Sequence, residues 1–300
     1  MGPEPSTDRQ PWTVGRLLSW TTDRLARGGV EEPRLSAEIL LAHAMVCERI
    51  ELYCRFEDEP GEQALATFRD LVRRAARHTP IAYLVGRKEF FSLSFEVNAD
   101  VLIPRPETEI LVDRAVVYCK GCGDPRVEVL DVGTGSGCII IALLSQAPNA
   151  RGTATDVSAA ALNVARRNAE RHEVADRVDF VEADRLNLPG EATPAGGFHL
   201  IVCNPPYVSK EEMDTLAQTV RDHEPAVALT DGGDGLSFFR SLANDGASIL
   251  KQGGAILVEI GAGQHEAVRA IFDAEGRFDH AGTYRSPSDP HERVIHFVRV

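Results

Sequence analysis

Residues 130–138 read LDVGTGSGC, a glycine-rich loop that joins a strand pattern to a helix pattern. The apolar strand ends at Asp131, and Gly133, Gly135 and Gly137 open the next helix. Glycines at such a junction allow a tight turn and let the backbone approach a ligand closely. The loop therefore predicts a nucleotide-like binding site at the start of an α/β domain.

Strand and helix patterns alternate on the carboxyl side of this loop. Such alternation is typical of a parallel, doubly wound sheet with helices on its faces. The last two strand patterns follow each other with no helix between them, which predicts an antiparallel hairpin at one edge. The seven expected strands cover residues 126–132, 150–157, 177–184, 198–204, 255–261, 278–285 and 293–300.

The amino-terminal part of the chain follows different patterns. Residues 1–12 are polar and rich in proline, so we expect them to be disordered. Residues 13–79 repeat apolar residues at helical spacing, which predicts a small helical domain without an obvious catalytic motif. Alternating, aromatic-rich residues then predict a β-hairpin linker within 80–106, and the α/β domain follows over 107–300.

Composition excludes several classes of function. The net charge of −13 is unsuited to gripping the phosphates of duplex DNA, so no direct nucleic-acid binding is expected. No apolar run reaches the roughly 18 residues of a membrane helix, and the chain does not begin with a secretory signal pattern. Cys119 and Cys122 form a C-x-x-C without a second pair, so no metal site is predicted. These features indicate a cytoplasmic protein.

The ligand of the glycine loop is narrowed by a second acidic residue. Asp156 ends the second expected strand, 19 residues after Gly137, where a carboxylate can accept both hydroxyls of a ribose. A dinucleotide site favours the spacing G-x-G-x-x-G, whereas this loop has G-x-G-x-G, which favours S-adenosylmethionine. Asp184 ends the third strand and is a candidate partner of an adenine amino group, although aspartate is also a common turn residue.

The stretch VCNPPYV, residues 202–208, ends the fourth expected strand with unusual chemistry. Asn204 offers a side-chain carbonyl and Pro205 a backbone carbonyl, both hydrogen-bond acceptors. Pro205 and Pro206 remove two backbone N–H donors, and Tyr207 adds a flat ring that can stack on a planar group. An inert turn is the plain alternative, but the position at a ligand-binding sheet edge favours a pocket for a planar –NH2 group.

Such a pocket supports methyl transfer to a poor nucleophile. The lone pair of an amide or aryl amine nitrogen is delocalised, and acceptors that prefer its charged or pyramidal form stabilise the transition state. Fixing the nitrogen in line with a sulfonium methyl group supplies proximity, so no strong general base is needed if the proton leaves late. The tetrapeptide alone does not choose between adenine and an amide.

At this point the sequence resembles a known family. The glycine loop, Asp156 and the tetrapeptide 204–207 resemble class I methyltransferases that act on planar amino groups. More specific stretches resemble the release factor glutamine methyltransferases of the HemK/PrmC type, from about residue 14 to the carboxyl end. They are PIAYLVGRKEFFSLSFEV (80–97), LIPRPETEILVD (102–113) and HEPAVALTDGGDGLSFFR (223–240).

The resemblance implies a fold and an activity. The fold is a class I methyltransferase (Rossmann-like) seven-stranded sheet with an antiparallel carboxyl-terminal hairpin, preceded by a small helical domain for substrate docking. The activity transfers a methyl group from S-adenosylmethionine to N5 of the glutamine in the Gly-Gly-Gln motif of peptide chain release factors, leaving S-adenosylhomocysteine. The implied partner is a release factor, and no membrane interaction is implied.

The resemblance also assigns residues. The implied cofactor-binding residues are Gly133, Thr134, Gly135, Ser136, Gly137, Asp156, Asp184, Arg185 and Asn204. Asn204, Pro205 and Tyr207 are the implied catalytic residues, and the implied substrate-binding residues are these three with Pro206, Arg105 and Glu107. This chain departs from its relatives at two places: they often carry an aromatic or apolar residue in place of Arg185, and a glycine within the proline-rich stretch 286–294.

Three alternatives stay open. A sibling activity would methylate a glutamine of a ribosomal protein. An adenine-N6 DNA methyltransferase uses the same kind of tetrapeptide, but it would need a basic target-recognition region that this acidic chain lacks. A binding module that has lost catalysis would have little reason to keep both the glycine loop and Asn204.

Overall fold

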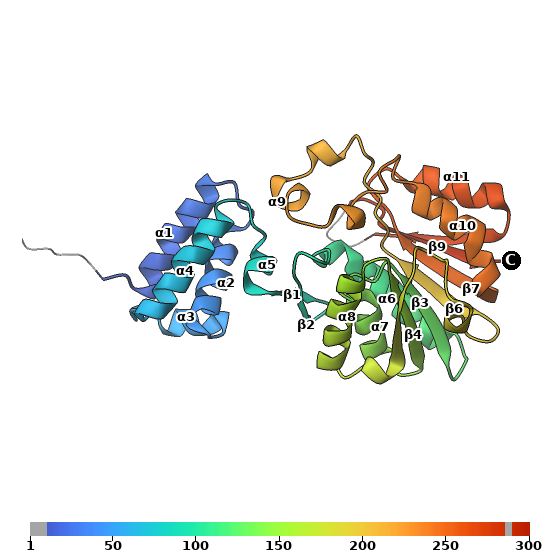
Figure 1. Ribbon diagram of the computed structural model, residues 1–300, viewed down its shortest axis with the longest axis horizontal. Coiled ribbons are helices and arrows are strands. Elements are labelled where there is room, and N and C mark those ends of the chain that lie inside the picture. The colour runs from blue at the N-terminus through green and yellow to red at the C-terminus, as the bar shows by residue number, and fades with distance from the viewer. Residues whose placement is uncertain (1–10, 286–289) are drawn as a thin grey trace, which may run out of the picture. The chain divides into compact units, whose positions relative to one another are not determined.

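The computed structural model describes residues 11–285 and 290–300. The chain divides into two compact units, residues 1–86 and 87–300. Figure 1 shows a helical first unit and a second unit built on one large sheet. The predicted disorder of residues 1–12 lies almost wholly outside the described residues, as does the start of the stretch 286–294.

The first unit is a small helical bundle with its own core. Leu18, Leu25, Leu40 and Leu41 are fully buried in that core, and Phe68 packs among them. Long helices carry these residues at the spacing that the sequence predicts. The helices are α1 (Val14–Arg27), α2 (Pro33–Met45), α3 (Arg49–Cys54), α4 (Glu62–Ala75) and α5 (Ile81–Val85).

The short helices α3 and α5 are not among the sequence expectations. Each is too short to display a helical period, so its signal is local. Helix α3 begins with a capping box, in which Glu48 caps the first turn and the Glu51 side chain accepts from the Glu48 N–H at 2.8 Å. Helix α5 begins after Pro80 and ends at Gly86 in the left-handed conformation, which glycine adopts without strain.

The expected β-hairpin is present, and it belongs to the second unit. Strands β1 (Arg87–Phe90) and β2 (Leu93–Glu96) pair antiparallel. Glu109 accepts a hydrogen bond from the Phe91 N–H at 2.8 Å, which ties the hairpin tip to the helix that follows. The boundary at Gly86 therefore falls inside the segment 80–106, with α5 on one side and the hairpin on the other.

The second unit contains the predicted seven-stranded sheet. Its strand order is β5-β4-β3-β6-β7-β9-β8, with β3 to β7 parallel and β8 and β9 antiparallel at one edge. The predicted α/β fold and its terminal hairpin are confirmed. The strands are β3 (Val127–Val132), β4 (Ala150–Asp156), β5 (Val178–Glu182), β6 (Phe198–Cys203), β7 (Leu250–Glu259), β8 (Phe278–Tyr284) and β9 (Val294–Arg299).

Two segments differ from the sequence expectation. Strand β7 begins at Leu250 rather than near residue 255, because Leu250 pairs with Phe198 ahead of a register shift. Polar Lys251 and Gln252 and two glycines conceal this start. The sequence pattern between the fourth and fifth expected strands predicts a longer helical stretch, but residues 205–236 contain only short helices joined by turns: η4 (Met213–Thr215), α9 (Gln218–Arg221) and η5 (Ala226–Ala228).

Helices cover both faces of the sheet (Figure 1). Residues alternate along each strand between two clusters: Val129 and Val202 face one side, Leu130 and Ile201 the other. No helix in the described part of the chain is long and apolar enough to cross a membrane. The helices are η1 (Pro106–Thr108), α6 (Glu109–Gly121), α7 (Cys138–Gln146), α8 (Ala159–Arg171), η2 (Ala175–Arg177), η3 (Gly190–Ala192), α10 (Ser237–Ile249) and α11 (His265–Glu275).

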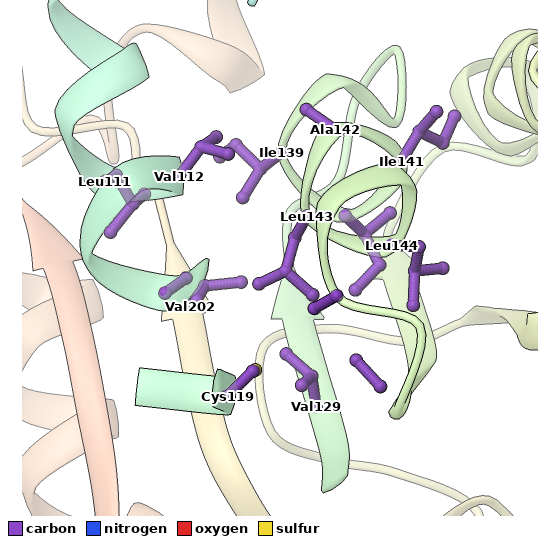
Figure 2. Close-up of a cluster of buried hydrophobic side chains, with 14 of the residues drawn as sticks. Leu111, Val112, Cys119, Val129, Ile139, Ile141, Ala142, Leu143, Leu144 and Val202 are labelled. Carbon is purple, nitrogen blue, oxygen red and sulfur yellow. The ribbon is translucent and has the colours of Figure 1, made fainter. Parts of the chain in front are cut away.

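The first cluster explains why the glycine loop is rigid. Figure 2 shows side chains of α6 and α7 meeting those of β3 and β6. Helix α7 follows the loop directly, and its residues from Cys138 to Leu144 are buried. Gly137 precedes it with a φ of 81°, and a Cβ there would lie 2.7 Å from Ile141 Cδ1. The absence of a side chain at Gly137 therefore lets α7 pack against α8 and the sheet.

We expect Gly137→Ala to destabilise the protein by about 1–3 kcal/mol more than Gly123→Ala. Gly123 has a φ of 73° but no atom within 4 Å of a Cβ position, so its variant isolates the left-handed backbone penalty. Denaturant unfolding of both variants measures the difference. Equal destabilisation would show that close packing at Gly137 is unimportant.

Candidate active site

The glycine loop is anchored at both ends by hydrogen bonds. The Thr134 hydroxyl donates to Asp131 Oδ2 at 2.6 Å, and the Thr134 N–H donates to the Thr155 carbonyl at 2.7 Å. The Gly137 N–H then donates to the Thr134 carbonyl at 2.8 Å, which closes the turn. The loop is thus tied to the ends of β3 and β4.

Asp131 is a fully buried carboxyl group beneath this loop. Burial raises its pKa to about 7, and nearby Asp156 acts in the same direction. Hydrogen bonds from Thr134 and from the Ile140 backbone oppose the shift. Asp131 therefore holds the loop from below and makes no direct approach to solvent.

Asp156 ends β4 beside the loop, as its position in the sequence predicts. Its Oδ2 accepts from the Gly135 N–H and its Oδ1 from the Ser158 N–H, both at 2.9 Å. Burial raises the pKa of Asp156, while these backbone hydrogen bonds lower it. Because a carboxylate offers about four lone-pair sites, acceptor capacity is left on Asp156 for the hydroxyls of a ribose.

The surface of the loop fits the cofactor that the sequence predicts. Gly133 and Gly135 have φ values of 72° and 53°, and no atom lies within 4 Å of a Cβ position on either. Thr134 and Ser136 are buried. The Ser136 carbonyl accepts from the Asn168 side chain at 2.9 Å. The two glycines thus present open backbone, whereas Thr134 and Ser136 brace it from within.

Asp184 and Arg185 lie beyond the end of β5. The Asp184 side chain is 75% exposed. Arg185 has a φ of 53°, donates to the Ser237 hydroxyl at 3.2 Å and places its guanidinium 4.7 Å from the Phe238 ring centroid. Arg185 thus fastens the loop after β5 to the start of α10. Contacts of Asp184 and Arg185 with adenine stay predictions.

The loop before α10 is organised by one carboxylate. Asp231 accepts from the N–H groups of Gly233, Gly235 and Ser237 at 2.8, 3.1 and 3.0 Å. Partial burial acts to raise its pKa, but hydrogen bonds from Ser237 and the two glycines lower it to about 2. A Cβ on Gly235 would lie 2.2 Å from the Tyr207 carbonyl, so this loop packs directly on the tetrapeptide.

Asn204 follows the last residue of β6 and is oriented by a residue of the 102–113 segment. Its Nδ2 donates to the hydroxyl of Thr108 at 3.2 Å, which leaves the side-chain carbonyl as an acceptor. Pro205 and Pro206 are buried, and the Val208 N–H donates to the Leu229 carbonyl at 2.9 Å. The tetrapeptide is therefore held on both sides.

Tyr207 is anchored at its hydroxyl and its backbone. The hydroxyl donates to Glu259 Oε1 at 3.4 Å, and the Tyr207 carbonyl accepts from Gln264 Nε2 at 2.9 Å. Burial raises the pKa of Tyr207 well above its usual range, and Glu259 adds to that shift. These contacts fix the ring plane in advance.

Glu259 is a site residue that the sequence interpretation missed. It ends β7 beside β6 and is 2% exposed. Burial raises its pKa to about 7, against the lowering influence of Thr108, Arg293 and Tyr207. The sequence contained a signal for Glu259, because a lone glutamate lies near the end of the apolar run AILVEIG, at the same sheet edge as Asn204. Thr108 was also missed, because only the charged residues Arg105 and Glu107 of this segment were assigned to the site.

Arg105 and Glu107 have different surroundings. Arg105 Nη2 donates to Glu224 Oε1 at 2.6 Å, and Glu224 Oε2 accepts from the Ile103 N–H at 3.1 Å. The Glu224 side chain is 1% exposed, so this ion pair joins the segments 102–113 and 223–240. Glu107 lies close enough to Tyr207 and Glu259 to raise the pKa of both.

The parallel strands bring the predicted residues to one edge of the sheet. Strands β3, β4 and β6 are in register near their carboxyl ends, where Val132 pairs with Thr155 and with Cys203. The glycine loop, Asp156 and Asn204 follow at that edge, which is where α/β sheets bind ligands. Asp184 extends the same edge beyond β5.

Comparison with known proteins places this site in context. Two family models match, the PrmC N-terminal domain over residues 16–86 and the methyltransferase small domain over 122–238. The release factor glutamine methyltransferase of Rhodopirellula baltica is 42% identical over 97% of this chain and 98% of that protein. The protein of the same name from Chlorobaculum tepidum is 40% identical over 88% and 91%.

Solved structures with the same fold come from more distant proteins. The human Mettl16 catalytic domain, in complex with MAT2A 3′UTR hairpin 6, matches with a TM-score of 0.53 at 18% identity. That match covers 77% of this chain and 81% of the other. The N-terminal domain of human METTL16 in complex with SAH gives a TM-score of 0.51 at 18% identity, over 70% and 76%. At this identity the likeness shows the fold alone.

We expect the unfolding free energy of the wild type to fall, relative to that of Asp131→Asn, between about pH 4 and pH 7. The folded protein keeps the Asp131 proton up to about pH 7, whereas the unfolded chain loses it near 3.8. Because the folded state binds the extra proton, stability decreases as pH rises through this window and levels off above it. Denaturant unfolding at a series of pH values measures this. A pH-independent difference would contradict the raised pKa.

Proposed function

The chain belongs to the family of release factor glutamine methyltransferases, and we propose that it methylates the side-chain nitrogen of the glutamine in the Gly-Gly-Gln motif of a peptide chain release factor. It is an S-adenosylmethionine-dependent methyltransferase. One observation carries the assignment of the nitrogen: Asn204, with Pro205 behind it, is held with its carbonyl free at the ligand-binding edge of the sheet.

The geometry of the loop supports the proposed cofactor-binding residues. When bound, S-adenosylmethionine supplies an electrophilic methyl group on a sulfonium sulfur. The backbone at Gly133 and Gly135 would allow the cofactor to approach closely. Asp156 would accept hydrogen bonds from the ribose hydroxyls with its remaining lone pairs. Thr134, Ser136 and Gly137 act indirectly, because they keep the loop in shape.

The substrate-binding residues act on the amide group. The carbonyls of Asn204 and Pro205 accept its two N–H groups, and the Tyr207 ring sets its plane. These acceptors favour the nitrogen as it becomes pyramidal and positive, so stabilisation grows toward the transition state. Glu107 raises the pKa of Tyr207, so we place it on the substrate side of the site. Arg105 supports this side indirectly, through its ion pair with Glu224.

The first unit is proposed to dock the protein substrate. A cavity of about 490 Å³ between α1 and α4 is lined by Trp12, Trp20 and Phe68 with Arg24, Arg69, Arg73 and Arg77. Among the described residues, Arg24, Arg69 and Arg77 make no ion pair, while Arg73 pairs with Asp70. A basic, aromatic groove on a chain of net charge −13 suits an acidic segment of the release factor that carries apolar side chains. The cytoplasmic location stays a prediction.

Transfer from labelled S-adenosylmethionine tests the proposed substrate. We expect label on a release factor and none on its Gln→Ala variant in the Gly-Gly-Gln motif, on ribosomal proteins or on duplex DNA. Label on the Gln→Ala variant as well would place the modified atom elsewhere. Label on ribosomal protein or on DNA alone would favour the corresponding alternative activity.

Asn204→Ala should separate binding from chemistry. The substitution removes a hydrogen-bond acceptor whose contribution is largest in the transition state. We therefore expect the transition-state stabilisation, measured from kcat/KM, to fall by on the order of 2–4 kcal/mol. Cofactor affinity, measured by calorimetry, should stay close to that of the wild type. If the main effect were weaker cofactor binding, Asn204 would not have the assigned role.

Trp20→Ala and Arg69→Glu should each raise KM for the intact release factor by on the order of tenfold. Activity on a short peptide that contains only Gly-Gly-Gln should not change, because that peptide lacks the docked segment. Arg27→Glu, on the same helix α1 but outside the groove, is the matched control. If Arg27→Glu raised KM as much as Arg69→Glu does, the effect would come from general charge rather than from the groove.

A further inference from the structure

Three segments that lie far apart in the sequence meet around two hydroxyl groups beside the tetrapeptide. Thr108 comes from η1, Asn204 and Tyr207 follow β6, and Glu259 ends β7. Asn204 Nδ2 lies 3.2 Å from Thr108 Oγ1, and the Tyr207 hydroxyl lies 3.4 Å from Glu259 Oε1. Thr108 and Glu259 are each only 2% exposed, so water does not compete for these groups.

The direction of the hydrogen bonds follows from the hydrogen atoms available. The Thr108 hydroxyl accepts from the Asn204 amide, so its single hydrogen is free to donate. Thr108 lies close enough to Glu259 to lower its pKa, so the two side chains are neighbours in the site. With its N–H committed to Thr108, the Asn204 amide has one orientation, and its carbonyl faces away from Thr108.

Glu259 lies between the tetrapeptide and the 102–113 segment. The Tyr207 hydroxyl donates to its Oε1 at 3.4 Å, and Thr108 of the 102–113 segment lies close enough to lower its pKa. The charged groups that act on Glu259 are Arg293, before β9, and Glu107, on η1. The Glu259 carboxyl oxygen is an acceptor for Tyr207 that an apolar side chain could not supply.

We propose that Thr108 and Glu259 are positioning residues of the methyl transfer: Thr108 sets the orientation of the Asn204 carbonyl, and Glu259 holds the Tyr207 ring through its hydroxyl. This inference rests on the proposed function, since the carbonyl and the ring are the groups assigned to the substrate amide. Neither positioning residue touches the amide. Their effect is on the rate of transfer rather than on the affinity for cofactor.

Thr108→Val removes the hydroxyl at nearly constant volume, and Thr108→Ser keeps it. We expect Thr108→Val to lower kcat on the release factor by up to about 100-fold, the scale of a misplaced catalytic group, with little change in KM or in cofactor affinity. Thr108→Ser should recover most of the rate. Thr21→Val is the matched control, because Thr21 is fully buried and its hydroxyl has no hydrogen-bond partner in the described part of the chain.

Glu259→Leu extends the test to the second positioning residue. Leucine has no acceptor for the Tyr207 hydroxyl, so we expect the same signature, a lower kcat with nearly unchanged KM and cofactor affinity. Glu259→Gln keeps a carbonyl oxygen that can accept from Tyr207 and should recover most of the rate. A loss that appeared chiefly in cofactor affinity would show a structural role only and would overturn the assignment for Glu259.

Hydrogen exchange of the Asn204 side-chain amide, followed by NMR and assigned by its absence in Asn204→Ala, provides a measurement independent of activity. Exchange should be slow in the wild type and in Thr108→Ser, and markedly faster in Thr108→Val. Unchanged exchange in Thr108→Val, or a wild-type kcat in that variant, overturns the inference. A wild-type protein that methylated no release factor would instead overturn the proposed function, while the exchange rates would still decide whether Thr108 holds Asn204.

Discussion

The parallel pairing of β3 with β4 and β6 is the constraint on which the rest of the structure depends. It ends these strands at one edge, so residues distant in sequence arrive there together. The glycine loop follows β3, Asp156 ends β4 and Asn204 follows β6. Strand β7 extends the same edge and contributes Glu259. The site is thus a consequence of strand direction, and the connecting segments only complete it.

The polar groups buried at this edge have a desolvation cost that the local hydrogen bonds offset only in part. Asp131 and Glu259 are both nearly inaccessible, and burial raises the pKa of each to about 7. Asp131 accepts from the hydroxyl of Thr134 beneath the cofactor loop, and Glu259 accepts from that of Tyr207 beneath the tetrapeptide. Each buried carboxyl therefore supports one half of the site, at a cost to the stability of the fold.

Much of this arrangement could be predicted from the sequence, because its signals are local. The glycine spacing, the acid at the end of the second strand and the prolines after the fourth strand each depend on neighbouring residues. Thr108 could not be found in this way, since its importance arises from a contact with Asn204 across 96 positions of sequence. The glutamate at the end of the fifth strand was a local signal for Glu259, but its role depends on a contact with Tyr207 across 52 positions. Strand β7 began earlier than expected for a similar reason: its first residue, Leu250, pairs with Phe198 of β6, ahead of a polar and glycine-rich register shift.

The most direct test of the account is the position of the transferred methyl group. Tandem mass spectrometry of a release factor, after incubation with this protein and S-adenosylmethionine, locates that group to a single side chain. The account predicts one methyl group on the side-chain nitrogen of the glutamine in the Gly-Gly-Gln motif. A methyl group on another residue, or an unmodified motif in the presence of active enzyme, would contradict it.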